Sequence, residues 1–210
     1  MKPITEYDFR EIADRFVVLN IPNYLAPSLE CENYIAYCYI DIERGISFVL
    51  YGEYKDGNVY EIKNGMTTLR YSKELNLEIY NSPNEKMTQY ATRMKELYTM
   101  PDWINDVRAN TKYDPYRDKA FPDDMILTIR TPKDNSGTNF DQIEEVLWVR
   151  PISILDNGEL IGITIEDGSY IKNNTMVWIW ENVDENHSIV AVTTDWIDML
   201  NRYSKGEEND

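Results

Sequence analysis

The chain has few of the residues on which metal and thiol chemistry depend. It contains two cysteines, Cys31 and Cys38, and a single histidine, His187, in 210 residues. Two cysteines and one histidine cannot fill a usual four-ligand zinc site. If residues 31–40 form one strand, the two thiols lie on opposite faces more than ~20 Å apart, too far for a disulfide. Free thiols favour a reducing, cytoplasmic compartment.

Long apolar runs and phosphate-binding glycine motifs are also missing. The nine glycines are scattered singly and mark turns, so no nucleotide cofactor, nor any other cofactor, is expected. The apolar runs are too short to span a bilayer, and the first residues lack the apolar segment of a secretory signal. His187 falls in a polar turn with no nucleophile motif beside it, so we predict no catalytic residue.

The chain has an excess of acidic residues. It has 37 Asp and Glu against 21 Lys and Arg, which gives a net charge of −16. Residues 141–210 alone hold fifteen acidic and four basic residues. Such a concentration of negative charge repels nucleic acid and anionic membranes and attracts basic protein surfaces.

Hydrophobic periodicity predicts several helices. Where apolar residues recur every three to four positions, the chain is expected to be helical. Ser82 and Pro83 are suited to cap and start the middle helix. The predicted helices cover residues 5–19, 83–99 and 194–203, with a shorter one that begins at Pro101.

Alternating β-forming residues between turn pairs predict short antiparallel strands. About five of them form a meander in the first half, and four form a second meander in the last third. The expected strands cover residues 34–40, 46–51, 59–63, 67–71, 75–80, 125–130, 146–154, 160–165, 175–180 and 188–193.

Together these elements predict an α+β protein. It has an N-terminal helix plus an antiparallel sheet, middle helices, and a C-terminal four-stranded β-meander closed by a helix. Residues 133–139 are the most polar stretch and the best linker candidate. The expected domains are residues 1–131 and residues 141–203, with one continuous domain as the open alternative. Residues 204–210 are expected to be a disordered acidic tail.

The last third carries a Trp-Val strand, glycine turns and a closing Asp-Trp pair. These residues are Trp148-Val149, Gly158, Gly162, Gly168 and Asp195-Trp196. In this respect the segment resembles small bacterial β-barrel domains of unknown function. The resemblance covers about a third of the chain, implies a small-barrel-like fold for it, and implies no activity.

High acidity without catalytic or secretion motifs leads to our first functional hypothesis. It is a non-enzymatic interaction protein of bacterial or phage origin that binds and neutralises a basic protein partner, as immunity and anti-defence proteins do. Such a protein binds neither nucleic acid nor membrane and works in the cytoplasm of a bacterial cell or phage-infected host. The predicted acidic face consists of Glu144, Glu145, Glu159, Glu166, Asp167, Glu181, Asp184 and Glu185.

A second hypothesis is a metal-dependent hydrolase or phosphodiesterase. Carboxylates in the irregular stretch 110–124 could hold Mg²⁺ or Ca²⁺ for such a reaction. Basic residues are interleaved with them, which favours ion pairs within the stretch. The metal ligands of this alternative are Asp114, Asp118, Asp123 and Asp124.

A third hypothesis is a small-ligand binding module on the tyrosine-rich sheet. Aromatic residues that alternate with aliphatic ones along strands more often belong to a core than to a binding site. The aromatic residues concerned are Tyr34, Tyr37, Tyr39, Phe48, Tyr51, Tyr54, Tyr60, Tyr71 and Tyr80.

Overall fold

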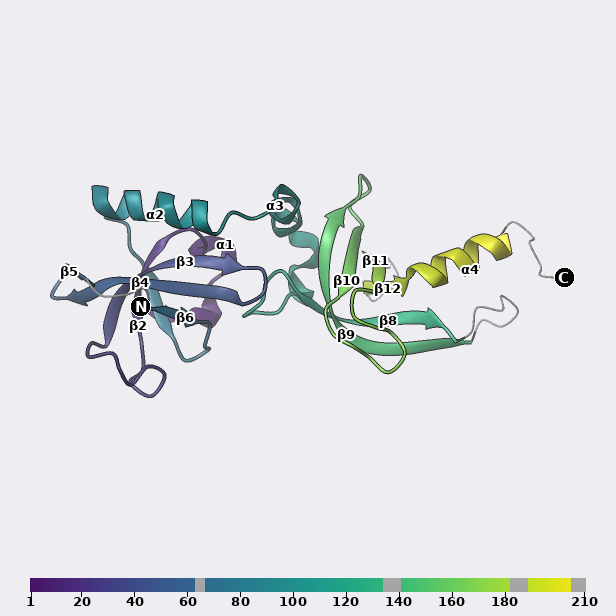
Figure 1. The fold of residues 1–210 in the computed structure, drawn as a ribbon, viewed down its shortest axis with the longest axis horizontal. Helices are drawn as coiled ribbons and strands as arrows, with labels where there is room; N and C mark the ends of the chain where they lie inside the picture. Colours follow the sequence, from purple (N-terminus) through teal and green to yellow (C-terminus); the bar gives the residue numbers. More distant parts are fainter. Residues whose placement is uncertain (63–66, 134–140, 182–188, 205–210) are drawn as a thin grey trace. The chain divides into compact units, whose positions relative to one another are not determined.

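The computed structural model describes residues 1–62, 67–133, 141–181 and 189–204, which form two compact units (Figure 1). Unit 1 comprises Met1–Met100 and Lys119–Pro122, and unit 2 comprises Pro101–Asp118 and Asp123–Asp210. The division therefore falls near residue 100, whereas the sequence placed it in the polar stretch after residue 131. The predicted linker at 133–139 and tail at 204–210 lie almost entirely outside the described residues.

Unit 1 is built on a seven-stranded antiparallel sheet with the order β1-β7-β2-β3-β4-β5, in which β6 also pairs with β4. Its elements in chain order are β1 (Lys2–Pro3), a 3-10 turn (Ile4–Glu6), α1 (Phe9–Ile12), β2 (Phe16–Asn20), β3 (Asn33–Asp41), β4 (Gly45–Lys55), β5 (Asn58–Glu61), β6 (Thr68–Arg70), β7 (Asn76–Ile79) and α2 (Glu85–Leu97).

The predicted N-terminal helix over residues 5–19 is wrong for most of its length. α1 has only four residues, and Asp14 takes a left-handed conformation with φ of 58° that ends it. The chain then enters β2, in which Phe16 and the next three residues are all buried. Four consecutive buried side chains suit a strand covered on both faces, whereas an amphipathic helix buries only one stripe.

Residues 33–80 form strands as predicted, but they are not a simple meander. β4 has eleven residues, so one of its edges is long enough for two short strands. β5 pairs with it between Gly52 and Lys55, and β6 pairs between Ser47 and Val49. β7 instead pairs with β2 and β1 across the sheet. These long-range pairings follow from tertiary packing and have no local signal.

The sheet of unit 1 is buried on both faces, which explains why β3 and β4 read as almost continuous apolar runs. α2 runs along one face (Figure 1) and contributes Met87 and Met94 to the core there. The strand residues on this face are Phe16, Val18, Ile35, Tyr37, Tyr39, Val49 and Tyr51. The opposite face buries Val17, Leu19, Ala36, Cys38, Phe48 and Leu50.

Unit 2 contains a closed five-stranded barrel with the order β10-β11-β12-β8-β9. Its elements are α3 (Asp102–Ala109), a 3-10 segment (Thr111–Tyr116), β8 (Met125–Pro132), β9 (Gln142–Ile154), β10 (Leu160–Thr164), β11 (Met176–Glu181), β12 (Ile189–Thr193) and α4 (Thr194–Ser204).

The α+β class and a small C-terminal barrel are confirmed, but the barrel has one strand more than the predicted meander. β9 to β12 form the meander, and β8 closes it by pairing antiparallel with β9 and parallel with β12. The barrel interior holds alternate strand residues such as Leu127, Ile129, Leu147 and Val149, and Tyr113 packs among them. This packing places residues 101–118 in the same unit as the barrel. No helix among the described residues is long and apolar enough to cross a membrane.

Candidate functional site

α2 presents one side-chain row to a cavity beside the sheet of unit 1. The helix starts after Asn84, whose side chain accepts a hydrogen bond from the Met87 backbone nitrogen at 3.0 Å. The structure thus moves the cap two residues along from the predicted Ser82. From this start, residues spaced i, i+3, i+4 and i+7 share one face. They are Tyr90, Arg93, Met94 and Leu97.

A β-bulge in β4 supplies the opposite wall. Ala36 pairs with Leu50, but Ile35 pairs with Gly52, so Tyr51 is an extra residue in β4. The bulge lets Tyr51 face α2 while its neighbour Leu50 also reaches the cavity. Gly52 permits β5 to approach closely, because a Cβ at this position would lie 2.7 Å from the carbonyl oxygen of Tyr60.

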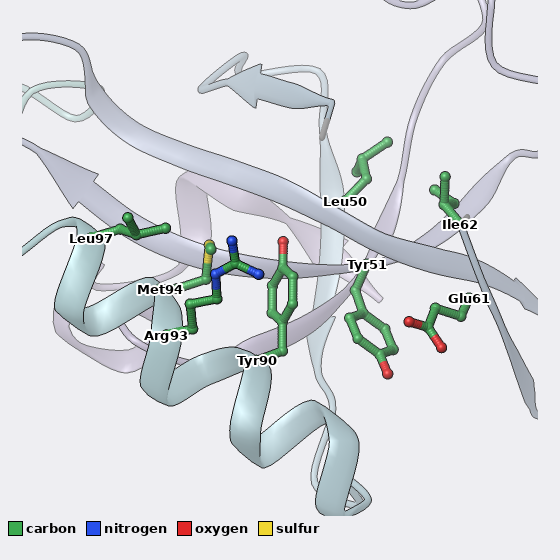
Figure 2. A pocket seen from close by; sticks show the side chains of 8 residues that line it. All are labelled: Leu50, Tyr51, Glu61, Ile62, Tyr90, Arg93, Met94 and Leu97. Carbon is green, nitrogen blue, oxygen red and sulfur yellow. The ribbon is translucent and has the colours of Figure 1, made fainter. Parts of the chain in front are cut away.

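These elements enclose a cavity of about 270 Å³ (Figure 2). The rings of Tyr51 and Tyr90 meet edge to face with centroids 5.2 Å apart. The remaining walls are mostly aliphatic, and Glu61 and Ile62 complete them at the end of β5. The cavity therefore combines an apolar interior with two phenol groups and two charged side chains.

The two charged side chains lie beside different tyrosines. Figure 2 shows the Arg93 guanidinium next to the Tyr90 hydroxyl, and the Glu61 carboxylate next to the Tyr51 ring. Burial raises the pKa of Tyr90 to about 12, although the charge of Arg93 acts in the opposite direction. Burial and then the charge of Glu61 raise the pKa of Tyr51. Both phenols are therefore neutral hydrogen-bond donors at physiological pH.

Glu61 also contacts Lys86 on the first turn of α2, with Lys86 Nζ and Glu61 Oε2 3.9 Å apart. The two side chains are 79% and 55% exposed, so this pair contributes little to stability. A bound cation can therefore displace Lys86 from Glu61 at small cost.

Most of the described carboxylates of the predicted acidic face divide into two groups. In the first, Glu166 accepts a hydrogen bond from the Trp148 backbone nitrogen at 3.0 Å, and Glu145 binds the loop that follows Glu166. In the second, the charges of Glu159 and Glu181 add to burial, which is the larger cause, in raising the pKa of Tyr113. The first group is Glu145, Glu166 and Asp167, the second is Glu159 and Glu181, and Glu144 lies apart from both, beside Arg130. Asp184 and Glu185 lie outside the described residues, as does His187.

Several of these carboxylates are engaged within unit 2. Glu145 accepts hydrogen bonds from the backbone nitrogens of Ser169, Tyr170 and Ile171, at 2.8 to 3.2 Å. Burial alone would raise the pKa of Glu145, but these N–H donors and the charge of Lys172 outweigh it and lower the pKa. Glu145 therefore holds a barrel loop in place.

Three other carboxylates of the predicted acidic face also have partners within unit 2. Asp167 accepts a hydrogen bond from the Asn173 backbone nitrogen at 3.0 Å. Glu144 pairs with Arg130 at 2.9 Å, and Glu181 pairs with Lys112 at 3.3 Å. Such contacts satisfy the carboxylates locally but leave the net charge of the unit unchanged.

Two of the proposed metal ligands form buried bidentate ion pairs. Arg108 donates to both oxygens of Asp123 at 2.7 and 2.6 Å. Arg150 donates to both oxygens of Asp124 at 2.7 and 3.0 Å. The Asp123 and Asp124 side chains are only 5% and 3% exposed. Burial raises the pKa of Asp124 against the opposing effect of Arg150.

The other two carboxylates of the metal hypothesis do not complete a site. Asp114 pairs with Arg117 at 3.1 Å, and the backbone nitrogen of Asp118 donates to the Asp124 carbonyl. In the part of the chain that the structure describes, no three Asp, Glu, His or Cys side chains are grouped as metal ligands. Of these ion pairs, Asp114–Arg117 lies within the stretch 110–124, whereas Asp123 and Asp124 pair with Arg108 and Arg150 from outside it.

Most of the strand aromatics are core residues, and only one of those predicted, Tyr51, lines the cavity. The apolar row on α2 was visible from its helical spacing. Arg93 was overlooked, although it lies three residues after Tyr90 and so shares its face. Glu61 had no signal, because its position depends on the bulge in β4. Cys31 and Cys38 are both free.

Known proteins offer no guide to this arrangement. The chain matches no family model, and no curated protein or solved structure is similar to it. Any function must therefore be argued from the geometry of the two units.

Proposed function

We propose that unit 1 binds a small organic ligand in the cavity between α2 and β4. One observation carries this proposal: a single concave site joins an apolar interior to two neutral phenols and two opposite charges. Ligand pockets typically combine apolar and aromatic walls with a few polar groups that orient the ligand. The edge-to-face pair of the buried Tyr51 and the half-buried Tyr90 supplies the aromatic wall.

The size and charges of the cavity favour a small zwitterion with an aromatic or aliphatic body. A volume of about 270 Å³ lies just below the usual range of ligand-pocket volumes, which restricts the ligand to a molecule with about one ring. Arg93 would bind a carboxylate, because a guanidinium matches carboxylate geometry. Glu61 would bind an ammonium group. The ligand body would lie against Tyr51 and Tyr90, where an aromatic ring finds edge-to-face partners.

Binding of L-phenylalanine to the full chain, followed by NMR, tests this proposal. Phenylacetate lacks the ammonium group and phenethylamine lacks the carboxylate, so both should bind more weakly. Arg93→Gln should weaken phenylalanine binding about five- to tenfold through loss of charge-assisted hydrogen bonds. Lys95→Gln is the matched control, since Lys95 is a cation on the same helix that does not line the cavity. Phenylalanine that leaves every cavity residue unperturbed at millimolar concentration would contradict the proposal.

A second candidate function belongs to unit 2. The observation that favours it is the charge: this unit holds 22 acidic and nine basic residues, net −13, against −3 for unit 1. We infer that unit 2 binds a basic protein partner and inhibits it, in the cytoplasm of a bacterium or phage-infected cell. A pull-down from the native host at low and high salt tests this. A basic partner that salt releases supports it, whereas an acidic or salt-insensitive partner contradicts it.

A further inference from the structure

The outer surface of β8 and β9 carries three cross-strand pairs that point away from the barrel interior. Ile126 pairs with Trp148, Thr128 pairs with Val146, and Arg130 pairs with Glu144. Their neighbours along each strand, such as Leu127 and Leu147, are buried inside the barrel. Because successive strand residues point to opposite faces, the three pairs share the outer face. We call the first two pairs the β8–β9 outer face.

This face exposes two large aliphatic side chains beside a tryptophan. Val146 is 63% exposed and Ile126 is 49% exposed, and Trp148 beside them is half-buried. Single exposed apolar residues are ordinary, but here three lie in contiguous cross-strand positions. Trp is a typical anchor at protein interfaces, and contiguous exposed apolar side chains mark interaction sites.

Carboxylates border the face at both ends. Glu144 precedes Val146 on the outer side of β9, and the Glu166 carboxylate accepts a hydrogen bond from the Trp148 backbone nitrogen. Glu144 is paired with Arg130, so the local charge is modest, but the whole unit carries −13. At physiological salt the field of such a unit extends about 8 Å into solvent.

We propose that the β8–β9 outer face docks a basic protein segment, which places an apolar side chain between Ile126 and Val146 and lysines or arginines toward Glu144 and Glu166. This inference rests on the second candidate function and names its surface. The charge also discriminates among occupants. A second copy of the chain would bring two strongly negative units together, and anionic lipid or nucleic acid would be repelled.

The test uses a synthetic twelve-residue peptide of alternating lysine and leucine, titrated into the isotope-labelled full chain. The peptide should perturb the amides of Ile126 and Val146 and change the fluorescence of Trp148. Val146→Ser should weaken binding about fivefold, because one exposed valine loses its apolar contact. Met176→Ser is the matched control: Met176 is 45% exposed on another strand of the same barrel, and its loss should change affinity less than twofold.

Two further peptides separate the apolar contribution to binding from the charge contribution. Oligolysine of equal length should bind more weakly than the lysine–leucine peptide, and a glutamate–leucine peptide should not bind. If Val146→Ser leaves binding unchanged and the perturbed amides lie on another face, the β8–β9 outer face is not the docking surface. The preference for a basic partner then still stands. No binding of any basic peptide at low salt overturns both.

Discussion

Replacing Glu145 by Gln should destabilise unit 2 much more than the same change at the adjacent Glu144. Glu145 accepts hydrogen bonds from three consecutive backbone N–H groups of the loop at residues 169–171. A glutamine keeps one acceptor oxygen but turns the other into an NH₂ group that faces those donors. At least one of these N–H groups then loses its partner, and the charge that strengthened the remaining bonds is gone.

The expected loss of unfolding free energy is about 2–3 kcal/mol. Hydrogen bonds to a charged group contribute about 1.5–3 kcal/mol each, and solvent screening of this half-buried carboxylate reduces their sum. For a domain of roughly 100 residues this corresponds to a fall in melting temperature of about 10–20 °C. Glu144 is 44% exposed and pairs with an equally exposed Arg130, so Glu144→Gln should cost less than about 0.5 kcal/mol.

Tryptophan fluorescence reports on the correct unit, because all five tryptophans lie between residues 103 and 196, within unit 2. The pH dependence provides an internal check. Since the folded pKa of Glu145 is lowered, its stabilisation is present above the ordinary pKa of 4.5 and is lost as pH falls through the folded pKa. The difference between wild type and Glu145→Gln should therefore shrink in acid. Equal stabilities of the Glu145→Gln and Glu144→Gln variants at neutral pH would refute the reasoning.

Three further predictions concern other contacts. Gly45→Ala should lower the unfolding free energy of unit 1 by more than about 3 kcal/mol, because φ is +68° and a Cβ would overlap the Ala120 carbonyl oxygen. Hydrogen exchange of the β4 amides measures this loss, and a value below about 1 kcal/mol would contradict the prediction. Asp123→Asn should lower the unfolding free energy of unit 2 by about 3–5 kcal/mol, because it leaves Arg108 without its counter-charge. An unchanged tryptophan-fluorescence unfolding transition in urea would argue against this. Burial and two nearby carboxylates raise the pKa of Tyr113 from 10.0 to about 12, so unit 2 should lose stability as pH rises through that interval. Tyr113→Phe should remove this part of the loss. Parallel curves of unfolding free energy against pH for wild type and Tyr113→Phe would disprove the prediction.

Local sequence patterns predicted those elements in which apolar residues recur at the helical or the strand period. α2 and the strands β9 to β12 were found because one face of each is apolar and turn residues bound them. β2 was missed because four buried residues in a row have no strand period, and because Phe16 and Val17 follow Ile12 and Ala13 at helical spacing. Barrel closure by β8 was missed because a parallel pair with β12 joins residues some sixty positions apart.

The candidate cavity could likewise be predicted only in part from local sequence patterns. Helical spacing identified Tyr90 and Met94 as one face of α2, and composition identified the strand tyrosines. The bulge at Tyr51 decides that this strand tyrosine lines the cavity, and the close approach at Gly52 brings Glu61 to the same place. A bulge depends on how two strands match across a sheet, so a single strand sequence does not reveal it.

The acidic residues of unit 2 act at two length scales, and this separates their roles. A carboxylate such as Glu145 that accepts backbone N–H bonds is satisfied locally, yet it keeps its unit charge and still contributes to the long-range field. Removing it would change loop stability and partner attraction together. Exposed Glu144, whose salt bridge is weak, changes the field without releasing a loop. Glu144→Gln therefore isolates electrostatic attraction, because it removes one charge without placing a like charge opposite Arg130. A lowered association rate with nearly unchanged stability would assign the acidity of this unit to recognition.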